Sequence, residues 1–316
     1  MNSSQILFFT LSAYGDPGPL RFLYFSLVLV LLLLIVFCNV LLIAVICVTR
    51  SLHEPMFLFL CSLFANELLG SSGLFPFLLL QILADVHRVS APLCFLQVFV
   101  LYLYGSVEFF ILAVMSYDRY VAICRPLQYH SLMTPQKVAV LVALTWALPF
   151  LTITALVGMS APLPLCRSVI DKIYCGNYAI VKLSCADTRL HNIYGLSYTV
   201  LSVVLPALSI LYSYARILQV CCSGSRQTRQ KALSTCTPHL ASVLNFSFGC
   251  CFQILQSRFE TRRASDPLQV FLSLYFLTCQ PLFTPLLYGL KMAKIQDACQ
   301  QLLCGGRAAA PAQLQA

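Results

Sequence analysis

Long intervals without charge divide the chain, and they constrain its fold more than any other feature. A helix needs about 20 apolar residues to cross about 30 Å of hydrocarbon. Each interval is long enough, and within them the only charged residues are Glu67 and Glu108. The sequence therefore predicts seven membrane-spanning helices. They occupy 22–49, 56–84, 89–117, 138–166, 190–215, 232–257 and 267–290.

The composition excludes most classes of soluble protein. Charged residues make up 10% of the 316 residues and hydrophobic ones 59%, whereas a soluble domain has about 25% charged residues. So little polar surface does not suit a disordered chain, a nucleic-acid-binding module or a routine cytosolic enzyme. The 20 Lys and Arg residues are also spread along the chain rather than clustered. A polytopic membrane protein remains.

The seven intervals are expected to be helical. Hydrocarbon requires every backbone polar group to pair within the protein, and the ten-residue alternation of a membrane β-barrel is absent. Pro206, Pro281 and Pro285 lie inside otherwise apolar intervals, where helical bundles use proline for kinks rather than ends. The predicted fold class is thus an all-α membrane protein with a seven-transmembrane helix bundle.

A short amphipathic eighth helix is expected along the inner membrane face at 291–303. Its apolar face would carry Ile295, Ala298, Leu302 and Leu303. Cys304 beside it is either a palmitoylation site or a free thiol.

The orientation of the chain rests on its basic residues and cysteines. Eleven Lys and Arg fall on the side that would be cytoplasmic and nine on the other, which is a weak preference. Four cysteines lie in connections on the opposite face, where thiols oxidise. Asn2-Ser3-Ser4 is a glycosylation acceptor pattern that is useful only if the N-terminus is outside. The four cysteines allow three pairings, among which spacing does not choose: Cys94, Cys166, Cys175 and Cys185.

A ten-residue motif closes the third interval. Its sequence is Met115-Ser116-Tyr117-Asp118-Arg119-Tyr120-Val121-Ala122-Ile123-Cys124. It resembles the signature of vertebrate olfactory receptors, within the rhodopsin-like class A of G-protein-coupled receptors. Similar stretches follow in order at 52–57, Ser213-Tyr214, 231–240 and 281–288. The chain departs from the usual family pattern at Cys38, Glu67, Gly176, Ser247 and Thr284.

The resemblance implies an odorant receptor rather than an enzyme. Such a protein would lie in the plasma membrane, bind a small, mostly apolar odorant and activate a heterotrimeric G protein, of the stimulatory, cyclase-linked class. It would contact membrane lipid but no nucleic acid and need no cofactor, apart from a possible bound Na⁺. Its parts would be an extracellular N-terminus at 1–21, a receptor domain at 22–290, and an amphipathic helix with a cytoplasmic tail at 291–316.

Other functions are open to the same sequence. A class A receptor for another small ligand would share these motifs. A transporter or channel should show internal repeats, but none is visible and the span count is odd. A membrane enzyme would need a motif such as G-x-S-x-G or H-E-x-x-H, and the chain has neither.

By resemblance, Asp118-Arg119-Tyr120 forms a latch. In the resting state Arg119 would pair with Asp118, and activation would free it for the G protein. The plain alternative is a charged pair that reaches from a helix end to the interface. Lys231, Thr235 and His239 are spaced four residues apart and share one helix face. The family packs this stripe against the third helix. Other switch residues implied in the same way are Tyr214, Pro285 and Tyr288.

Two carboxyl groups, Glu67 and Glu108, lie deep within predicted spans. Because bare carboxylates in lipid are costly, a shared proton or a cation held together with Asn39 would stabilise them. The resemblance suggests a sodium-like site, and neutral hydrogen-bonded carboxyls are the equal alternative. The resemblance also implies a Cys94–Cys175 disulfide, which leaves Cys166 and Cys185 to form a second.

The candidate ligand pocket is read from helical spacing on the outer half of the bundle. Ligand sites in helical bundles lie between helices and are mostly apolar. Leu101 stands where amine receptors carry an acid, so a cationic amine is disfavoured. Each residue alone is more readily core packing, and only the set suggests a cavity. The set comprises Leu101, Tyr102, Gly105, Ser106, Tyr198, Ser202, Cys250, Ile254, Leu274 and Leu277.

Overall fold

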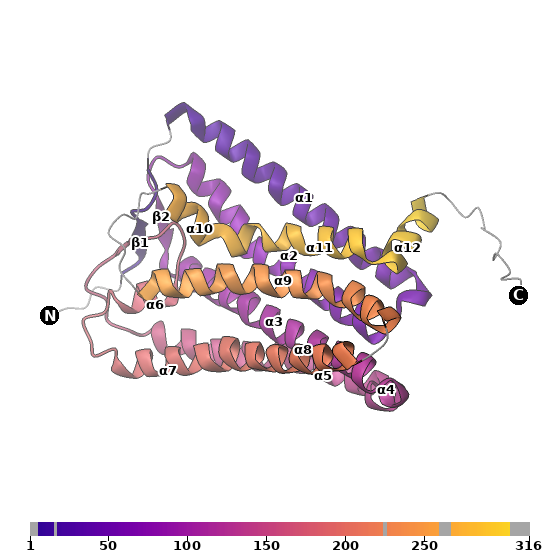
Figure 1. The fold of residues 1–316 in the computed structure, drawn as a ribbon. Coiled ribbons are helices and arrows are strands. Elements are labelled where there is room, and N and C mark those ends of the chain that lie inside the picture. The colour runs from indigo at the N-terminus through magenta and orange to yellow at the C-terminus, as the bar shows by residue number, and fades with distance from the viewer. Residues whose placement is uncertain (1–5, 16–17, 224–225, 259–266, 304–316) are drawn as a thin grey trace, which may run out of the picture.

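A bundle of seven helical rods forms the body of the protein in a computed structural model (Figure 1). The structure describes residues 6–15, 18–223, 226–258 and 267–303. The first four rods and the sixth are single helices, whereas the fifth and the seventh each consist of two helices. The rods are α1 (Arg21–Val48), α2 (Pro55–Leu83), α3 (Ala91–Cys124), α5 (Pro135–Ser160), α7 (Arg189–Thr199) continued by α8 (Leu205–Ser223), α9 (Arg226–Arg258), and α10 (Pro267–Thr278) continued by α11 (Gln280–Lys291).

Three predicted spans, 22–49, 56–84 and 267–290, agree with the helices to within one residue, and the other four differ by six to eight residues at one end. Five rods in the described part of the chain, α1, α2, α3, α5 and α7–α8, are long and apolar enough to cross a membrane. The seventh rod is divided into α10 and α11, each of 12 residues, which is too short to span alone. α3 extends beyond its predicted end at residue 117, so the Asp118-Arg119-Tyr120 motif lies within the helix.

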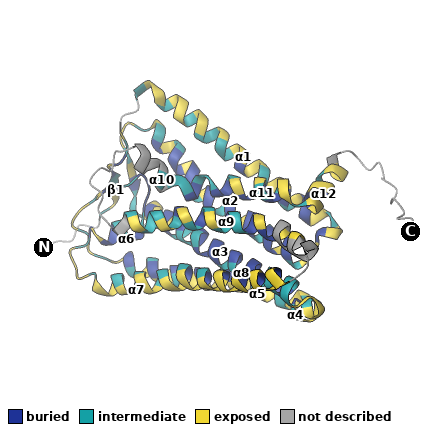
Figure 2. Ribbon diagram, viewed as in Figure 1, coloured by how far each residue is buried: buried dark blue, intermediate teal, exposed yellow. Residues whose placement is uncertain are grey.

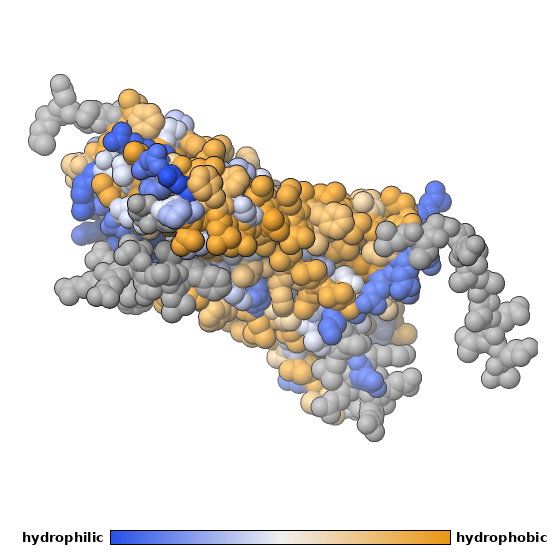
Figure 3. All heavy atoms as spheres, turned by 90° about the horizontal axis from the view of Figure 1, so that it is seen from above, coloured by the Kyte–Doolittle hydropathy of each residue, from blue (hydrophilic) through white to orange (hydrophobic). Residues whose placement is uncertain are grey.

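Helix α3 lies at the centre of the bundle. Its apolar window is 61% buried, whereas those of α1 and α5 are 28% and 22% buried. The outer rods bury one face and expose the other (Figure 2). The exposed side chains include Leu34, Phe37 and Leu151, and Figure 3 shows an apolar band between hydrophilic ends. Such a band is the surface that hydrocarbon requires.

Prolines change the local helix geometry in two rods. A π-helical turn at Val200–Val204 joins α7 to α8 just before Pro206. Single turns of this kind are local irregularities within α-helices. In the last rod α10 ends at Thr278 and α11 begins at Gln280, so the expected kink at Pro281 is a break. A proline has no N–H and its ring displaces the preceding turn. Pro285 remains inside α11, as predicted.

A small sheet covers one end of the bundle, which the all-α prediction did not include. Strand β1 (Phe8–Leu11) lies between β2 (Arg88–Ser90) and β3 (Val169–Ile170). β1 pairs antiparallel with β2, with Phe9 opposite Val89, and parallel with β3, with Thr10 opposite Val169. We call this the sheet end of the bundle. It also carries the short helix α6 (Asn177–Val181).

The opposite end carries α4 (Tyr129–Leu132) and α12 (Ala293–Leu303), and we call it the α12 end (Figure 1). α12 starts two residues later than the predicted amphipathic helix because α11 continues to Lys291. Its buried face carries Ile295 and Ala298, as predicted, while Leu302 is exposed. Cys304 lies outside the described residues.

Candidate functional site

Asp118 and Arg119 form an ion pair at the α12 end of α3. Arg119 Nε donates to Asp118 Oδ2 at 3.0 Å, and a second nitrogen of Arg119 contacts the same oxygen. The Asp118 side chain is fully buried, and its other oxygen accepts a 2.8 Å hydrogen bond from the Tyr129 hydroxyl of α4. Burial, followed by the negative charge of Asp118, raises the pKa of Tyr129. Tyr129 therefore stays protonated and holds the carboxylate in place.

A second polar contact joins three rods beside this ion pair. The Tyr214 hydroxyl on α8 lies 2.5 Å from His239 Nδ1 on α9, and His239 Nε2 lies 3.1 Å from the Leu112 carbonyl oxygen on α3. Because only a protonated Nε2 can bond a carbonyl, Nδ1 is the acceptor for the Tyr214 hydroxyl. His239 is fully buried. It connects α9 to α3 and α8.

The predicted stripe on helix six does not act as a unit. His239 is buried and bonded to α3 and α8, whereas Thr235, one turn earlier, is exposed. The side chain of Lys231 lies outside the described residues. Tyr288 on α11 is buried and packs edge-on against Phe64, with ring centroids 6.5 Å apart. Its hydroxyl has no hydrogen-bond partner among the described residues.

Glu67 and Glu108 meet in the middle of the bundle, and both are fully buried. Asn66, next to Glu67 on α2, bonds Glu108, and Tyr104, one turn before Glu108 on α3, bonds Glu67, so the two carboxyl groups share one polar cluster. The Tyr104 hydroxyl donates to Glu67 Oε2 at 3.0 Å, while Glu108 accepts from Asn66 at 3.0 Å and from Gln280 at 3.1 Å. Every neighbour that bonds these oxygens is a neutral donor.

Asn39 does not join this carboxyl pair by a hydrogen bond. Its Nδ2 donates to the carbonyl oxygens of Ile35 at 2.9 Å and Pro281 at 2.8 Å. It therefore joins α1 to the interrupted seventh rod. The Pro281 carbonyl oxygen can accept this bond because Pro285, four residues later in α11, has no N–H to donate to it. No group of three or more His, Cys, Asp or Glu side chains that could hold a metal ion occurs in the described part of the chain.

Polar side chains on α9 and α10–α11 extend the carboxyl cluster. Gln280 donates to Ser242 Oγ at 2.9 Å and accepts from Asn245 Nδ2 at 2.5 Å, and the Tyr275 hydroxyl bonds Asn245 Oδ1 at 2.5 Å. Asn245-Phe246-Ser247 also has the glycosylation acceptor pattern, and it lies inside the bundle. Gly70 on α2 leaves room for the Tyr104 ring, because a Cβ at this position would lie 2.5 Å from that ring.

A cavity of about 180 Å³ lies between the rods at the sheet end. Two of its polar groups face each other, since the Tyr198 hydroxyl contacts Ser106 Oγ and donates to the Tyr102 carbonyl oxygen at 3.3 Å. The predicted pocket residues on α3, on the rod of α7 and α8, and on α9 all line it. They are Leu101, Tyr102, Gly105, Ser106, Tyr198, Ser202, Cys250 and Ile254.

The two residues predicted on α10 do not line this cavity. Leu274 and Leu277 pack in the core, and Phe276 lines the cavity instead. The loop between α5 and α7 supplies the rest of the wall, including Lys172, Tyr174 and Tyr178. Burial and the nearby Lys182 lower the pKa of Lys172. Sequence spacing could not have found these loop residues, because a loop has no periodicity to extrapolate.

Comparisons with known proteins agree with this geometry. A family model described as olfactory receptor matches residues 26–306. Olfactory receptor 10A6 of Homo sapiens is 33% identical over 307 residues, 95% of this chain and 96% of the relative. Olfactory receptor 2G6 of Homo sapiens is 34% identical over 309 residues, 97% of this chain and 96% of the relative.

The chain belongs to the olfactory receptor family. Its fold is similar to that of squid rhodopsin, with a TM-score of 0.74 and 16% sequence identity over 93% of this chain and 90% of that structure. The predicted seven-helix class A fold is thus confirmed. The protein is a multi-pass membrane receptor, and the family consists of signalling receptors rather than enzymes.

Two disulfides lie at the sheet end of this olfactory receptor. The structure joins Cys94 to Cys175 and Cys166 to Cys185, each with Cα atoms 5.5 Å apart, a usual separation for a disulfide. This is the pairing that the family resemblance implies. The first bond fastens the loop over the cavity to the start of α3.

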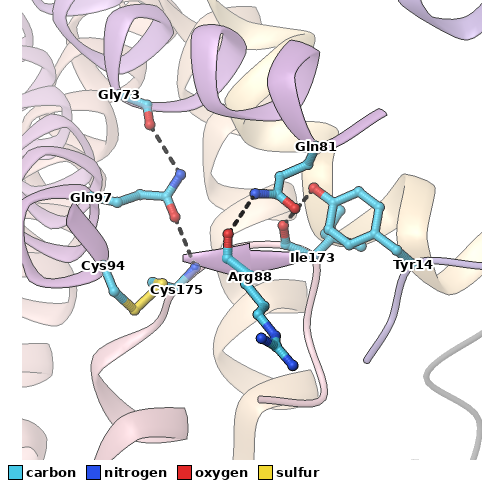
Figure 4. Close-up of a disulfide and its surroundings, with 8 residues drawn as sticks. All are labelled: Tyr14, Gly73, Gln81, Arg88, Cys94, Gln97, Ile173 and Cys175. Atoms are coloured by element: carbon cyan, nitrogen blue, oxygen red, sulfur yellow. Dashed lines mark hydrogen bonds between the residues drawn. A yellow bond between two sulfur atoms is a disulfide. The ribbon is translucent and has the colours of Figure 1, made fainter. Parts of the chain in front are cut away.

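Gln97 reinforces the first disulfide of the receptor (Figure 4). One turn after Cys94, its Oε1 accepts a 2.9 Å hydrogen bond from the Cys175 backbone N–H, and its Nε2 donates to the Gly73 carbonyl oxygen at 3.2 Å. The side chain is 4% exposed. Gln97 therefore links α2, α3 and the loop, a role that nothing in its sequence context indicates.

The N-terminal strand of the receptor fastens the other loops. Beside β1, the Tyr14 hydroxyl donates to the Ile173 carbonyl oxygen at 2.8 Å, and its ring stacks on His87 with centroids 4.4 Å apart. Gln81 at the end of α2 donates to the Arg88 carbonyl oxygen at 3.2 Å. The strand thus joins the α2–α3 connection to the loop over the cavity. Asn2 lies outside the described residues.

Proposed function

We propose that this receptor binds a small, mostly apolar odorant in the cavity at the sheet end and activates a heterotrimeric G protein at the α12 end. A single observation supports it most: α3 lines the cavity with Leu101 and Ser106 and carries the Asp118–Arg119 pair at its other end. One rigid element therefore connects a closed pocket with a breakable ion pair. The stimulatory, cyclase-linked class of G protein is the expectation from family resemblance.

The proposed orientation places the N-terminus and the sheet end outside the cell and the α12 end in the cytoplasm, at the plasma membrane. Both disulfides lie at the sheet end, and disulfides persist in oxidising compartments, which supports this orientation. Residues 1–21 would then be the extracellular N-terminus and 22–290 the receptor domain. Residues 291–316 would be the amphipathic helix and cytoplasmic tail.

The expected ligand follows from the wall of the cavity. Apolar surface comes from Leu101, Ile254 and Phe276, and Ser106 and Tyr198 offer hydroxyl groups. None of the α3 residues that line the cavity is acidic, so an amine would find no ion-pair partner on that helix. A small neutral compound with one hydrogen-bonding group suits such a wall best.

Activation would proceed by a shift between two arrangements of α9. A ligand changes the population of a state only by binding it better than the other. α9 contacts the cavity through Cys250 and Ile254 and contacts α3 and α8 through His239. An odorant that favours outward movement of α9 would break the His239 contact. Arg119 would then leave Asp118 and face a helix of the G protein, with Tyr120, Pro285 and Tyr288 completing the switch.

The carboxyl cluster gives the resting state two routes to stability. Glu67 and Glu108 are buried and close together, so either a shared proton or a Na⁺ ion must reduce their repulsion. In the Na⁺ route both carboxylates would bind the ion, and Asn39 would lie next to it without bonding either carboxylate. Basal signalling that is the same in Na⁺ and in choline buffers would favour the shared proton.

A ligand screen tests the proposed function. Cells that carry the receptor and a cyclic-AMP reporter are exposed to a panel of small volatile compounds, and at least one should give a saturable response. Arg119→Ala should abolish that response, because the buried Asp118 loses its partner and the G protein loses its contact. Surface labelling of both proteins controls for folding. Silence of the wild-type receptor in every G-protein pathway, despite surface expression, would contradict the proposal.

A further inference from the structure

A second hollow lies on the side of the bundle, between α3 and α8, towards the α12 end. It has a volume of about 380 Å³, and it is separate from the cavity at the sheet end because the two share no lining residue. Small side chains open it, since Ala113 of α3 and Ser209 of α8 lie in its wall. Larger side chains at these positions would fill it. Of the switch residues only Tyr120 lines it, and no residue of the odorant pocket does.

The hollow opens sideways, towards the hydrocarbon. Tyr212 of α8 lines it and is 63% exposed, and its neighbours Leu208 and Leu211 on the same helix are 57% and 65% exposed. Exposed leucines on a membrane-spanning helix face acyl chains. The space is therefore accessible from the bilayer.

The length of the hollow suits one leaflet. Its wall on α3 runs from Ala113 to Arg125, which is a rise of about 18 Å at about 1.5 Å per residue. Half of a hydrocarbon core of about 30 Å is about 15 Å. A single acyl chain could thus lie along the groove from the bilayer centre to the interface.

The interfacial end of the groove is basic and aromatic. Arg125 follows directly after α3 and is exposed. Lys137 Nζ donates to the Tyr117 hydroxyl at 3.1 Å and lies 5.2 Å from the centre of the Tyr117 ring. Two positive charges, those of Arg125 and Lys137, therefore lie at one mouth of the groove.

No carboxylate of the described residues pairs with these cations. The wall of the groove contains no Asp or Glu, and the nearby Asp118 is buried and already bonded to Arg119 and Tyr129. Positive charges at a membrane interface attract anionic headgroups, and tyrosines are enriched at such interfaces. An anionic headgroup from the bilayer would therefore complement the positive charge at the groove mouth.

We propose that this groove is a binding site for an anionic phospholipid, with one acyl chain between α3 and α8 and the headgroup phosphate on Arg125 and the Tyr117–Lys137 pair. With the orientation proposed above, the lipid comes from the cytoplasmic leaflet, where anionic lipids are concentrated. Tyr120, which follows Arg119, lines the same groove. A bound lipid therefore contacts the helix turn that carries the latch.

Binding to the full-length receptor in lipid nanodiscs tests the site, and the test needs neither an odorant nor a G protein. Nanodiscs contain phosphatidylcholine with a small fraction of phosphatidylserine that has the same acyl chains, and native mass spectrometry counts the lipids retained. The wild-type receptor should retain phosphatidylserine in preference. Arg125→Gln and Lys137→Gln should each weaken this about fivefold, the usual effect of one interfacial charge. Arg88→Gln, which removes an exposed charge at the sheet end, is the matched control and should change nothing.

Two further measurements make the test decisive. Photo-crosslinking of wild-type receptor with a phosphatidylserine that carries a reactive group on its acyl chain should label peptides of α3 and α8. Glycerol 3-phosphate, which has the phosphate but no chain, should not compete. Equal retention of both lipids, labelling confined to other helices, or full competition by glycerol 3-phosphate would each overturn the proposal. The wild-type measurements stand even if a variant fails to fold.

Discussion

The two ends of this receptor are held together in different ways. At the sheet end, two disulfides and a three-stranded sheet join segments that lie far apart in the sequence. At the α12 end, the contacts between rods are side-chain hydrogen bonds and ion pairs, such as Tyr214 with His239 and Lys294 with Glu54. Covalent bonds and backbone ladders do not open on binding a small ligand, whereas single polar contacts can.

This difference shows where the receptor can move. The cavity needs fixed walls, because a ligand selects between two states only if its contacts differ between them. The G-protein side must open, so each contact there should be weak enough to break. A buried hydrogen bond contributes only about 0.5–1.5 kcal/mol net, which a bound odorant can offset. Each prediction below breaks one contact at one end.

Loss of the main disulfide should have the largest effect. Cys175→Ser removes a bond that closes a separation of 81 residues, and such a bond contributes about 4–5 kcal/mol in the chain-entropy account. We expect the variant to be retained inside the cell. Flow cytometry of an N-terminal tag would measure this. Cys47→Ser, at an exposed free cysteine of α1, is the control, and normal surface density of the Cys175 variant would show that the loop holds without its bond.

Replacement of Gln97 should weaken the sheet end less. Gln97→Leu leaves the Cys175 N–H and the Gly73 carbonyl oxygen without their partner, and an unsatisfied buried group costs about 1–3 kcal/mol. The expected result is a lower thermal midpoint of the purified receptor, with the disulfide still formed. Gln97→Glu keeps the acceptor for Cys175, but it buries a carboxyl group and loses the donor to Gly73, so it should also lower the midpoint. An unchanged midpoint in both variants would mean that Gln97 has no structural role.

Breaking the contact at the α12 end should change activity rather than stability. Tyr214→Phe removes the hydroxyl that donates to His239, so the arrangement with α9 against α3 loses about 1 kcal/mol. Basal cyclic-AMP signalling should rise about fivefold. The same substitution at Tyr194, whose hydroxyl bonds the Thr152 carbonyl oxygen near the sheet end, should leave basal signalling unchanged. Equal effects of the two variants would remove the distinction between the ends.

The sequence predicted the rods better than the parts that close the cavity. Charge-free intervals reflect the thickness of the hydrocarbon layer, so α1 and α2 begin and end within one residue of the predicted positions. The sheet was not predicted because β1 has only four residues. Its partner strands lie about 80 and 160 positions away, and no local sequence pattern predicts pairing over such separations.

The site residues divide in the same way. Positions on α3, on α7 and its π-helical turn, and on α9 followed from helical spacing, and all of those predicted for the pocket line it. On α10 the cavity wall is formed by Phe276, while Leu274 and Leu277 pack in the core. Tyr129 lies eleven residues beyond Asp118 in a separate short helix, so only the three-dimensional fold brings it to the latch.

Acid should loosen the strand at the sheet end, with the smallest effect. Burial lowers the pKa of His87, which stacks on Tyr14. The folded strand therefore favours neutral His87, so the stabilisation is complete above the ordinary value of about 6.5. It falls as the pH drops from there through the lowered pKa, because the unfolded segment takes up the proton first. Hydrogen exchange of the β1 amides should be up to about twofold faster at pH 5 than at pH 7.5 after correction for intrinsic rates. His87→Phe keeps the stacking and should remove the pH dependence, whereas an identical profile in this variant would assign it to another group.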